Sequence, residues 1–111
     1  MLSFLSHSAY DEHRMHDGHP ERPERTQSVL SYLKKTGQWP GFNHLEACPV
    51  TAEALQRVHE PLYLEKLSTS APASGIVMID PDTHLCPGSL PAARLAAGAM
   101  EQAVDLILSG K

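Results

Sequence analysis

Short β-type runs and helical periodicities alternate along the chain. Residues 2–6 form an apolar-leaning run that is typical of a strand, and residues 45–49 form a second short one. Residues 76–79 (Ile-Val-Met-Ile) form the strongest strand signal, because they are rich in β-branched side chains and carry no charge. A run that is apolar on both faces favours a buried parallel strand. We therefore expect residues 76–79 to lie inside a parallel sheet.

Helical signals fill the intervals between these runs. Apolar spacing predicts helices over about residues 23–35, from residue 52, from residue 61, and over about residues 89–109. Their ends are marked by residues that favour helix termini: Pro23 and Pro61 in first turns, Thr51 and Ser89 as N-caps, and Gly37 and Gly110 as stops. Residues 68–75 are expected to form a loop. Strands alternating with helices predict an α/β architecture with a parallel sheet flanked by helices, in one domain over residues 1–111.

Composition narrows the class of protein. Hydrophobic residues make up 41% of the 111 residues, aromatic residues only 5%, and nine residues are proline, so the material for a core is thin. The net charge of −4 argues against a nucleic-acid partner. No apolar run is long enough for a membrane span and no basic segment opens the chain. Cys48 and Cys86 form no metal or redox pair motif, which agrees with a cytoplasmic location.

Two polar stretches contain the side chains that are candidates for metal binding or catalysis. His13, His16 and His19 recur every third position, a spacing that suits either a metal or a solvated histidine-rich loop. Asp80, Asp82 and His84 directly follow the strongest strand. Ligands gather at the carboxyl ends of strands in α/β sheets, so these three side chains are either ligands of a divalent cation or ordinary turn residues. No glycine-rich phosphate loop and no nucleophile-elbow motif is present.

Four segments in the same order resemble the histone deacetylase superfamily, which includes bacterial histone-deacetylase-like proteins, acetylpolyamine amidohydrolases and acetoin-utilisation proteins. They are residues 19–25 (HPERPER), residues 55–63 (LQRVHEPLY), residues 80–89 (DPDTHLCPGS) and the alanine-rich helix that ends at residues 103–110. This resemblance implies the N-terminal part of an arginase/deacetylase-type fold. It also implies zinc-dependent hydrolysis of acetyl-lysine or acetylated amines by the complete domain.

The resemblance also implies roles for individual residues. Asp82 matches the rim residue that hydrogen-bonds the substrate backbone, and His19 and Pro20 match the first rim loop. Arg25 matches an arginine that lines the internal acetate channel. Asp17-Gly18-His19 and Asp82-Thr83-His84 both have the spacing of the family's Asp-x-His zinc pair, but the segment that follows the second pair differs from the family's zinc loop.

The zinc ligands, the paired histidines and the catalytic tyrosine of the family have no match within residues 1–111. We therefore expect an incomplete domain that holds rim and channel residues, has no zinc site, and is inactive as an isolated chain. The expected partners are the complementing C-terminal part of the domain or further copies of the chain. Two alternatives remain open at this point: a non-catalytic, self-associating module, and a small metal site at Asp80, Asp82 and His84.

Overall fold

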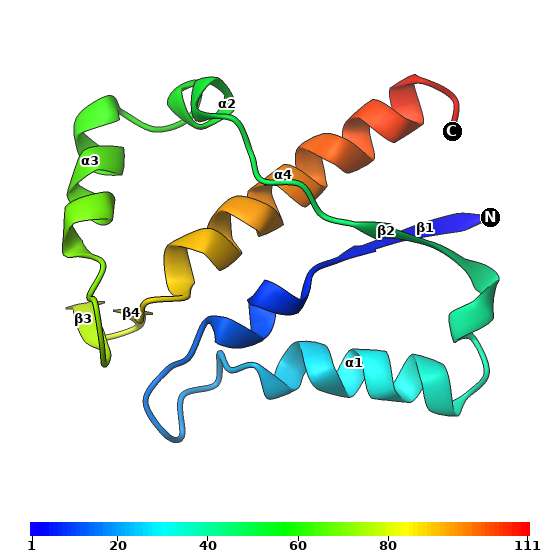
Figure 1. The fold of residues 1–111 in the computed structure, drawn as a ribbon, viewed down its shortest axis with the longest axis horizontal. Helices are drawn as coiled ribbons and strands as arrows, with labels where there is room; N and C mark the ends of the chain where they lie inside the picture. The colour runs from blue at the N-terminus through cyan, green and yellow to red at the C-terminus, as the bar shows by residue number, and fades with distance from the viewer.

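The computed structural model describes residues 1–111 and contains two strand pairs (Figure 1). Strands β1 (Leu2–Ser6) and β2 (Phe42–Glu46) run parallel, with Leu5 opposite Leu45. This pair confirms the predicted α/β architecture. The second strand begins at residue 42 and not at residue 45, because a 3₁₀ turn (η2, Trp39–Gly41) delivers Phe42 to the Phe4 ring, 5.6 Å away between centroids.

The remaining pair corrects the expectation for residues 76–79. Strand β3 (Val77–Asp80) pairs antiparallel with β4 (Thr83–Leu85) in a two-stranded hairpin, and all four β3 residues are exposed. The prediction of a buried parallel strand is therefore wrong. Only Pro81 and Asp82 make the turn between the two strands. A continuous apolar run indicates that both faces of a strand favour burial, but it does not specify which strands pair with it.

Four α-helices form close to the predicted positions: α1 (Glu24–Lys35), α2 (Ala52–Gln56), α3 (Pro61–Ser70) and α4 (Ser89–Leu108). The Thr51 hydroxyl accepts a hydrogen bond from the Ala54 N–H at 3.1 Å, which confirms the predicted N-cap. Gly37 and Gly110 follow their helices with φ of 73° and 75°, the left-handed conformation typical of a helix stop. Two boundaries differ: α3 continues into the predicted loop, and the N-cap of α4 is Gly88, one residue before Ser89.

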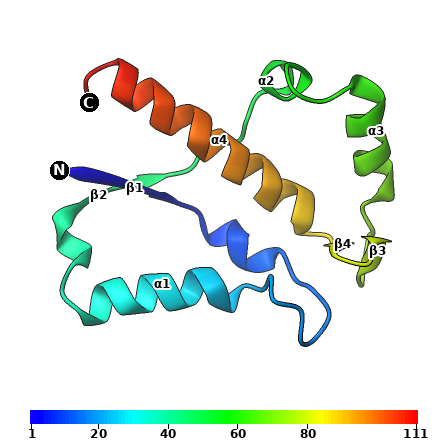
Figure 2. The same cartoon turned by 180° about the vertical axis from the view of Figure 1, so that it is seen from behind.

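The two views in Figures 1 and 2 show the β1–β2 pair between α1 and α4, with α3 standing apart from α1. A short 3₁₀ helix, η1 (Ser8–Glu12), continues from β1 along α4, and the Tyr10 hydroxyl donates to the Leu95 carbonyl at 3.2 Å. Gly98 allows the backbone after β2 to lie directly on α4, since a Cβ at this position would overlap the Cys48 carbonyl oxygen. The Val50 N–H donates to the Arg94 carbonyl at 2.9 Å at this crossing.

The fold has little interior. Only nine of the 111 residues are buried, and the accessible surface is 7861 Å². A compact monomer of 12.1 kDa would expose about 6,000 Å². The radius of gyration is 15.7 Å, against about 13 Å for a compact domain of this length. Large apolar side chains are accordingly exposed on β3 and along the C-terminal half of α4: Val77, Met78, Ile79, Met100, Val104, Ile107 and Leu108. None of the helices is long and apolar enough to cross a membrane.

Candidate functional site

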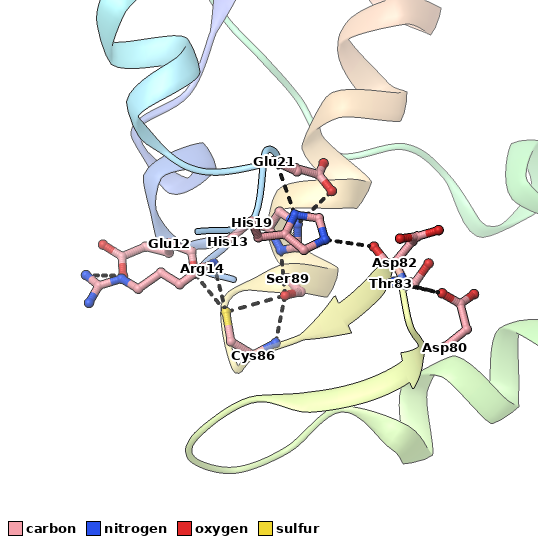
Figure 3. Close-up of polar contacts among 10 residues, drawn as sticks. All are labelled: Glu12, His13, Arg14, His19, Glu21, Asp80, Asp82, Thr83, Cys86 and Ser89. Carbon is pink, nitrogen blue, oxygen red and sulfur yellow. Dashed lines mark hydrogen bonds and ion pairs between the residues drawn. The ribbon is translucent and has the colours of Figure 1, made fainter. Parts of the chain in front are cut away.

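The segment of residues 12–22 lies against the β3–β4 hairpin and the start of α4, and a polar network joins them (Figure 3). The His13 Nδ1 lies 2.7 Å from the Ser89 Oγ, and the His13 Nε2 lies 3.8 Å from a Glu21 carboxylate oxygen. The Ser89 Oγ also accepts the Cys86 N–H at 2.8 Å. Ser89 is thus part of a tertiary link, and its side chain does not cap the helix in which it is the first residue.

Cys86 occupies the centre of this network. Its Sγ accepts the Arg14 N–H at 3.2 Å and donates to the Glu12 carbonyl at 3.0 Å, and the Ser89 hydroxyl lies 3.4 Å away. Burial by itself would raise the pKa of the Cys86 thiol, but hydrogen bonds from the Arg14 N–H, the Ser89 side chain and the nearby helix N–H groups together hold the pKa below its ordinary value. Cys86 is buried, whereas Cys48 is exposed, and both are free thiols.

His19 and Asp82, two residues that the resemblance assigns to the rim, lie together. The His19 Nε2 is 3.2 Å from the Asp82 carbonyl oxygen, although 63 positions separate the two residues (Figure 3). Asp80 shapes the turn, because its carboxylate accepts the N–H groups of Asp82 and Thr83, each at 2.8 Å. The hydrogen bonds from Asp82 and then Thr83 hold the pKa of the Asp80 carboxyl below its ordinary value. Pro20 is exposed beside this contact.

His84 lies in β4, two residues after Asp82. It is 6% exposed, and neither ring nitrogen has a hydrogen-bond partner. The rings of His16 and His19 pack edge-on against it, with centroids 4.8 and 5.0 Å away. The orphaned nitrogens mark a buried polar position that the chain itself leaves unsatisfied.

The structure does not bring either proposed set of metal ligands together. No three His, Cys, Asp or Glu side chains of residues 1–111 are grouped so that they could hold a metal ion. In the first set, His13 turns to Ser89 while His16 and His19 pack on His84. In the second set, Asp80 is occupied by backbone N–H groups and Asp82 is exposed, whereas His84 is buried. The alternative of a metal site at Asp80, Asp82 and His84 is therefore not supported by this geometry.

Arg25 lies in the first turn of α1. It lines a cavity of about 880 Å³ bounded by α1, β1, η1, strand β4 of the hairpin and the first turns of α4. His13, Glu21 and Ser89 reach the same cavity, so the polar network forms part of its wall. The remaining wall is largely apolar, with Phe4, Val29 and Trp39 among its residues. The proposed channel residue thus lies on the wall of this cavity.

Local spacing indicates His13 only as a candidate metal ligand and assigns no role to Glu21, Cys86 or Ser89 in a shared network. The contacts that join residues 12–14 to Cys86 and Ser89 span 72 to 76 positions, and local spacing carries no signal for such pairs. The only local clue is the position of Cys86 and Ser89 at the start of a long helix, where unpaired N–H groups attract acceptors.

Comparisons with known proteins bear on this arrangement. The histone deacetylase-like amidohydrolase of Pseudomonas aeruginosa is 35% identical over 94 residues, which are 85% of this chain and 24% of the relative. Histone deacetylase 8 of Arabidopsis thaliana is 33% identical over 90 residues, 81% of this chain and 24% of the relative.

The crystal structure of the HDA15 HD domain superposes with a TM-score of 0.88 and 26% sequence identity, over 98% of this chain and 32% of that chain. The chain therefore has an arginase/deacetylase-type fold and spans about a quarter to a third of the length of these proteins. The model of the histone deacetylase domain matches residues 19–111. On this match, the chain belongs to the histone deacetylase domain family.

Proposed function

We propose that this chain is the N-terminal part of a zinc-dependent deacetylase that hydrolyses acetyl-lysine or acetylated amines. In this role it supplies substrate-rim and channel residues and is inactive without the rest of the domain. The observation that carries the proposal is the contact between His19 and Asp82, since it joins two separate family segments at one exposed edge. We also propose a cytoplasmic location, which two free thiols support.

The chemistry of Asp82 supports the rim role. Its carboxylate is exposed and makes no hydrogen bond or ion pair within residues 1–111, while both of its backbone polar groups are held. A carboxylate only accepts hydrogen bonds, so it is suited to the N–H groups of a peptide or amide substrate. Arg25, on the wall of the cavity, carries a permanent positive charge that suits a leaving carboxylate such as acetate.

The residues of this chain do not fit zinc. A catalytic zinc site needs three protein ligands that converge on an open position, and no such group of side chains is assembled here. We therefore assign the metal, and the proton transfers that accompany it, to residues outside this segment.

The extent of uncovered apolar surface supports a partner. Ile79 is 42% exposed and Ile107 is 75% exposed, in a molecule whose surface exceeds that of a compact monomer. We propose that the complementing part of the deacetylase domain covers β3 and the C-terminal half of α4. Self-association of the chain is the second candidate, and the same exposed face favours it when the complement is absent.

A chimera tests the proposed function. In the P. aeruginosa amidohydrolase, this chain replaces the segment that it matches, and hydrolysis of an acetyl-lysine peptide and of an acetylated polyamine is measured. We expect turnover from the chimera and none from the 111-residue chain alone. The Asp82→Ala chimera serves as the rim variant, and removal of a charged hydrogen bond predicts a rise in KM of about 10-fold or more.

Two results would contradict the proposal. The first is a chimera that is folded and monodisperse but does not hydrolyse either substrate. The second is hydrolysis by the purified 111-residue chain, which would require a complete catalytic site within it.

A further inference from the structure

The turn that carries Asp82 is held from two sides. From within the hairpin, the Asp80 carboxylate accepts the Asp82 N–H at 2.8 Å. From outside, the His19 ring lies 3.2 Å from the Asp82 carbonyl. The backbone of Asp82 is therefore satisfied at both its polar groups, and its side chain alone remains free.

The hydrogen bonds of His19 define its tautomer. The Glu21 N–H donates to the His19 Nδ1 at 3.1 Å, so this nitrogen must carry a lone pair and not a proton. The proton of the neutral ring then lies on Nε2, which is the nitrogen that faces the Asp82 carbonyl. His19 is thus an acceptor toward its own loop and a donor toward the hairpin, and it can do both only in this one form.

Packing limits the movement of the ring. His19 is half-buried, and its ring contacts His84, which lies in β4 two residues after Asp82. His16 packs on the same His84 ring but makes no hydrogen bond to the hairpin turn. Of the two histidines that contact His84, only His19 is bonded to the turn.

We propose that His19 is a positioning residue, which places the Asp82 carboxylate for substrate by donating its Nε2–H to the Asp82 backbone carbonyl. This inference rests on the proposed rim role of Asp82. In this proposal His19 does not contact the substrate itself and acts on substrate binding through Asp82. The expected signature is a change in substrate binding without a change in the chemical step.

Three His19 variants in the chimera test the proposal by steady-state kinetics. His19→Ala removes both hydrogen bonds and is expected to raise KM by about 3- to 10-fold at unchanged kcat. His19→Gln keeps an amide donor near the Nε2 position and is expected to restore most of the KM. His19→Asn can replace only Nδ1 and is expected to resemble His19→Ala. The matched control is His16→Ala, which leaves KM unchanged.

A double variant shows whether His19 acts through Asp82. In the Asp82→Ala background, His19→Ala is expected to change KM by less than about twofold, because the two substitutions remove one shared effect. An equal KM rise in both backgrounds would overturn the positioning role. If Asp82→Ala alone leaves KM unchanged, the rim role itself fails, and the positioning role for substrate fails with it.

Imidazole ¹⁵N NMR of the 111-residue chain measures the contact without any activity. We expect the neutral His19 ring to show one tautomer, protonated at Nε2. This readout does not require the chain to be part of an active enzyme. A ring that averages between tautomers, or is protonated at Nδ1, would overturn the proposal even if the Asp82→Ala chimera confirms the rim.

Discussion

The His13 ring and the Ser89 hydroxyl lie 2.7 Å apart and join the histidine-rich segment to the first residue of α4, 76 positions later. Ser89 is 3% exposed and also accepts the Cys86 N–H, so its oxygen satisfies a buried donor while it holds the ring. This single hydroxyl connects the segment that precedes the HPERPER motif to the helix that follows the hairpin.

Ser89→Ala is expected to lower the free energy of unfolding by about 1–3 kcal/mol, because it leaves the buried Cys86 N–H without an acceptor. Urea unfolding followed by circular dichroism measures the effect. Ser109→Ala is the matched control, since Ser109 is exposed and bonds only the Leu106 carbonyl of its own helix end. Equal stability of the two variants would show that the tertiary link contributes nothing.

Gly98→Ala is expected to destabilise the crossing of α4 with residues 48–50 by about 1–3 kcal/mol, because the added methyl group would overlap the Cys48 carbonyl oxygen and crowd the Val50 nitrogen. Gly41→Ala is the control, as a Cβ there meets nothing within 4 Å. Thermal unfolding of both variants against the parent chain measures the difference. A Gly98→Ala chain as stable as Gly41→Ala would mean that α4 does not contact this segment.

The two thiols are expected to react differently with iodoacetamide. Cys48 is exposed and should be alkylated in the folded chain, whereas Cys86 is buried and should react only after urea is added. The hydrogen bonds that lower the pKa of Cys86 favour the reactive thiolate, so the expected lack of reaction in the folded chain follows from burial. Mass spectrometry of the alkylated chain identifies the modified residue. Rapid alkylation of Cys86 without urea would show that the network around it is open.

The Asp80 carboxylate is expected to make the stability of the hairpin turn depend on pH. Its pKa is lowered because the Asp82 N–H, and then Thr83, bond the charged form. The stability that it contributes is fully present above the ordinary carboxyl pKa of about 3.9 and is lost as the pH falls through the lower pKa of the folded state. The ¹³C chemical shift of the side-chain carbonyl carbon of residue 80 reports this titration in NMR spectra.

Asp80→Asn supplies the control for this titration, because the amide does not ionise and the shift should stay constant. A transition of the parent chain centred at or above the ordinary carboxyl pKa would contradict the hydrogen bonds of the turn.

The isolated chain is expected to self-associate through the exposed apolar residues of α4. Ile107 and Leu108 are 75% and 80% exposed, and their replacement by lysine should shift the sedimentation distribution toward monomer. The double variant Gln27→Lys and Ser31→Lys, which adds the same charge at exposed positions of α1, is the control and should leave the distribution unchanged. A parent chain that sediments as a monodisperse monomer would refute the prediction.

Local chemistry accounts for what could be predicted. Thr51, Gly37 and Gly110 mark helix ends through their own hydrogen bonds or backbone conformations, so the helix positions follow from the residues themselves. Pro61 begins α3 for the same kind of reason, since its missing N–H is not needed in a first turn. The four segments that resemble the deacetylase family can also be recognised from the sequence, because each is a contiguous run of residues.

Long-range pairing accounts for what could not be predicted. The apolar run at residues 76–79 correctly indicated a strand, but only the tertiary structure decided that it turns back antiparallel onto Thr83–Leu85 and stays exposed. The Asp-x-Asp-x-His spacing left a cation site and an ordinary turn as alternatives, and the fold ties Asp80 to the turn and buries His84.

The sequence by itself determined the helix positions, the presence of strand-forming runs and the deacetylase family, because each depends on neighbouring residues or contiguous motifs. The tertiary structure alone decided that His19 meets Asp82 and that His13 meets Ser89. These contacts join residues 63 and 76 positions apart. Such contacts depend on how whole elements pack, and no periodicity of 2 or 3.6 residues records that packing.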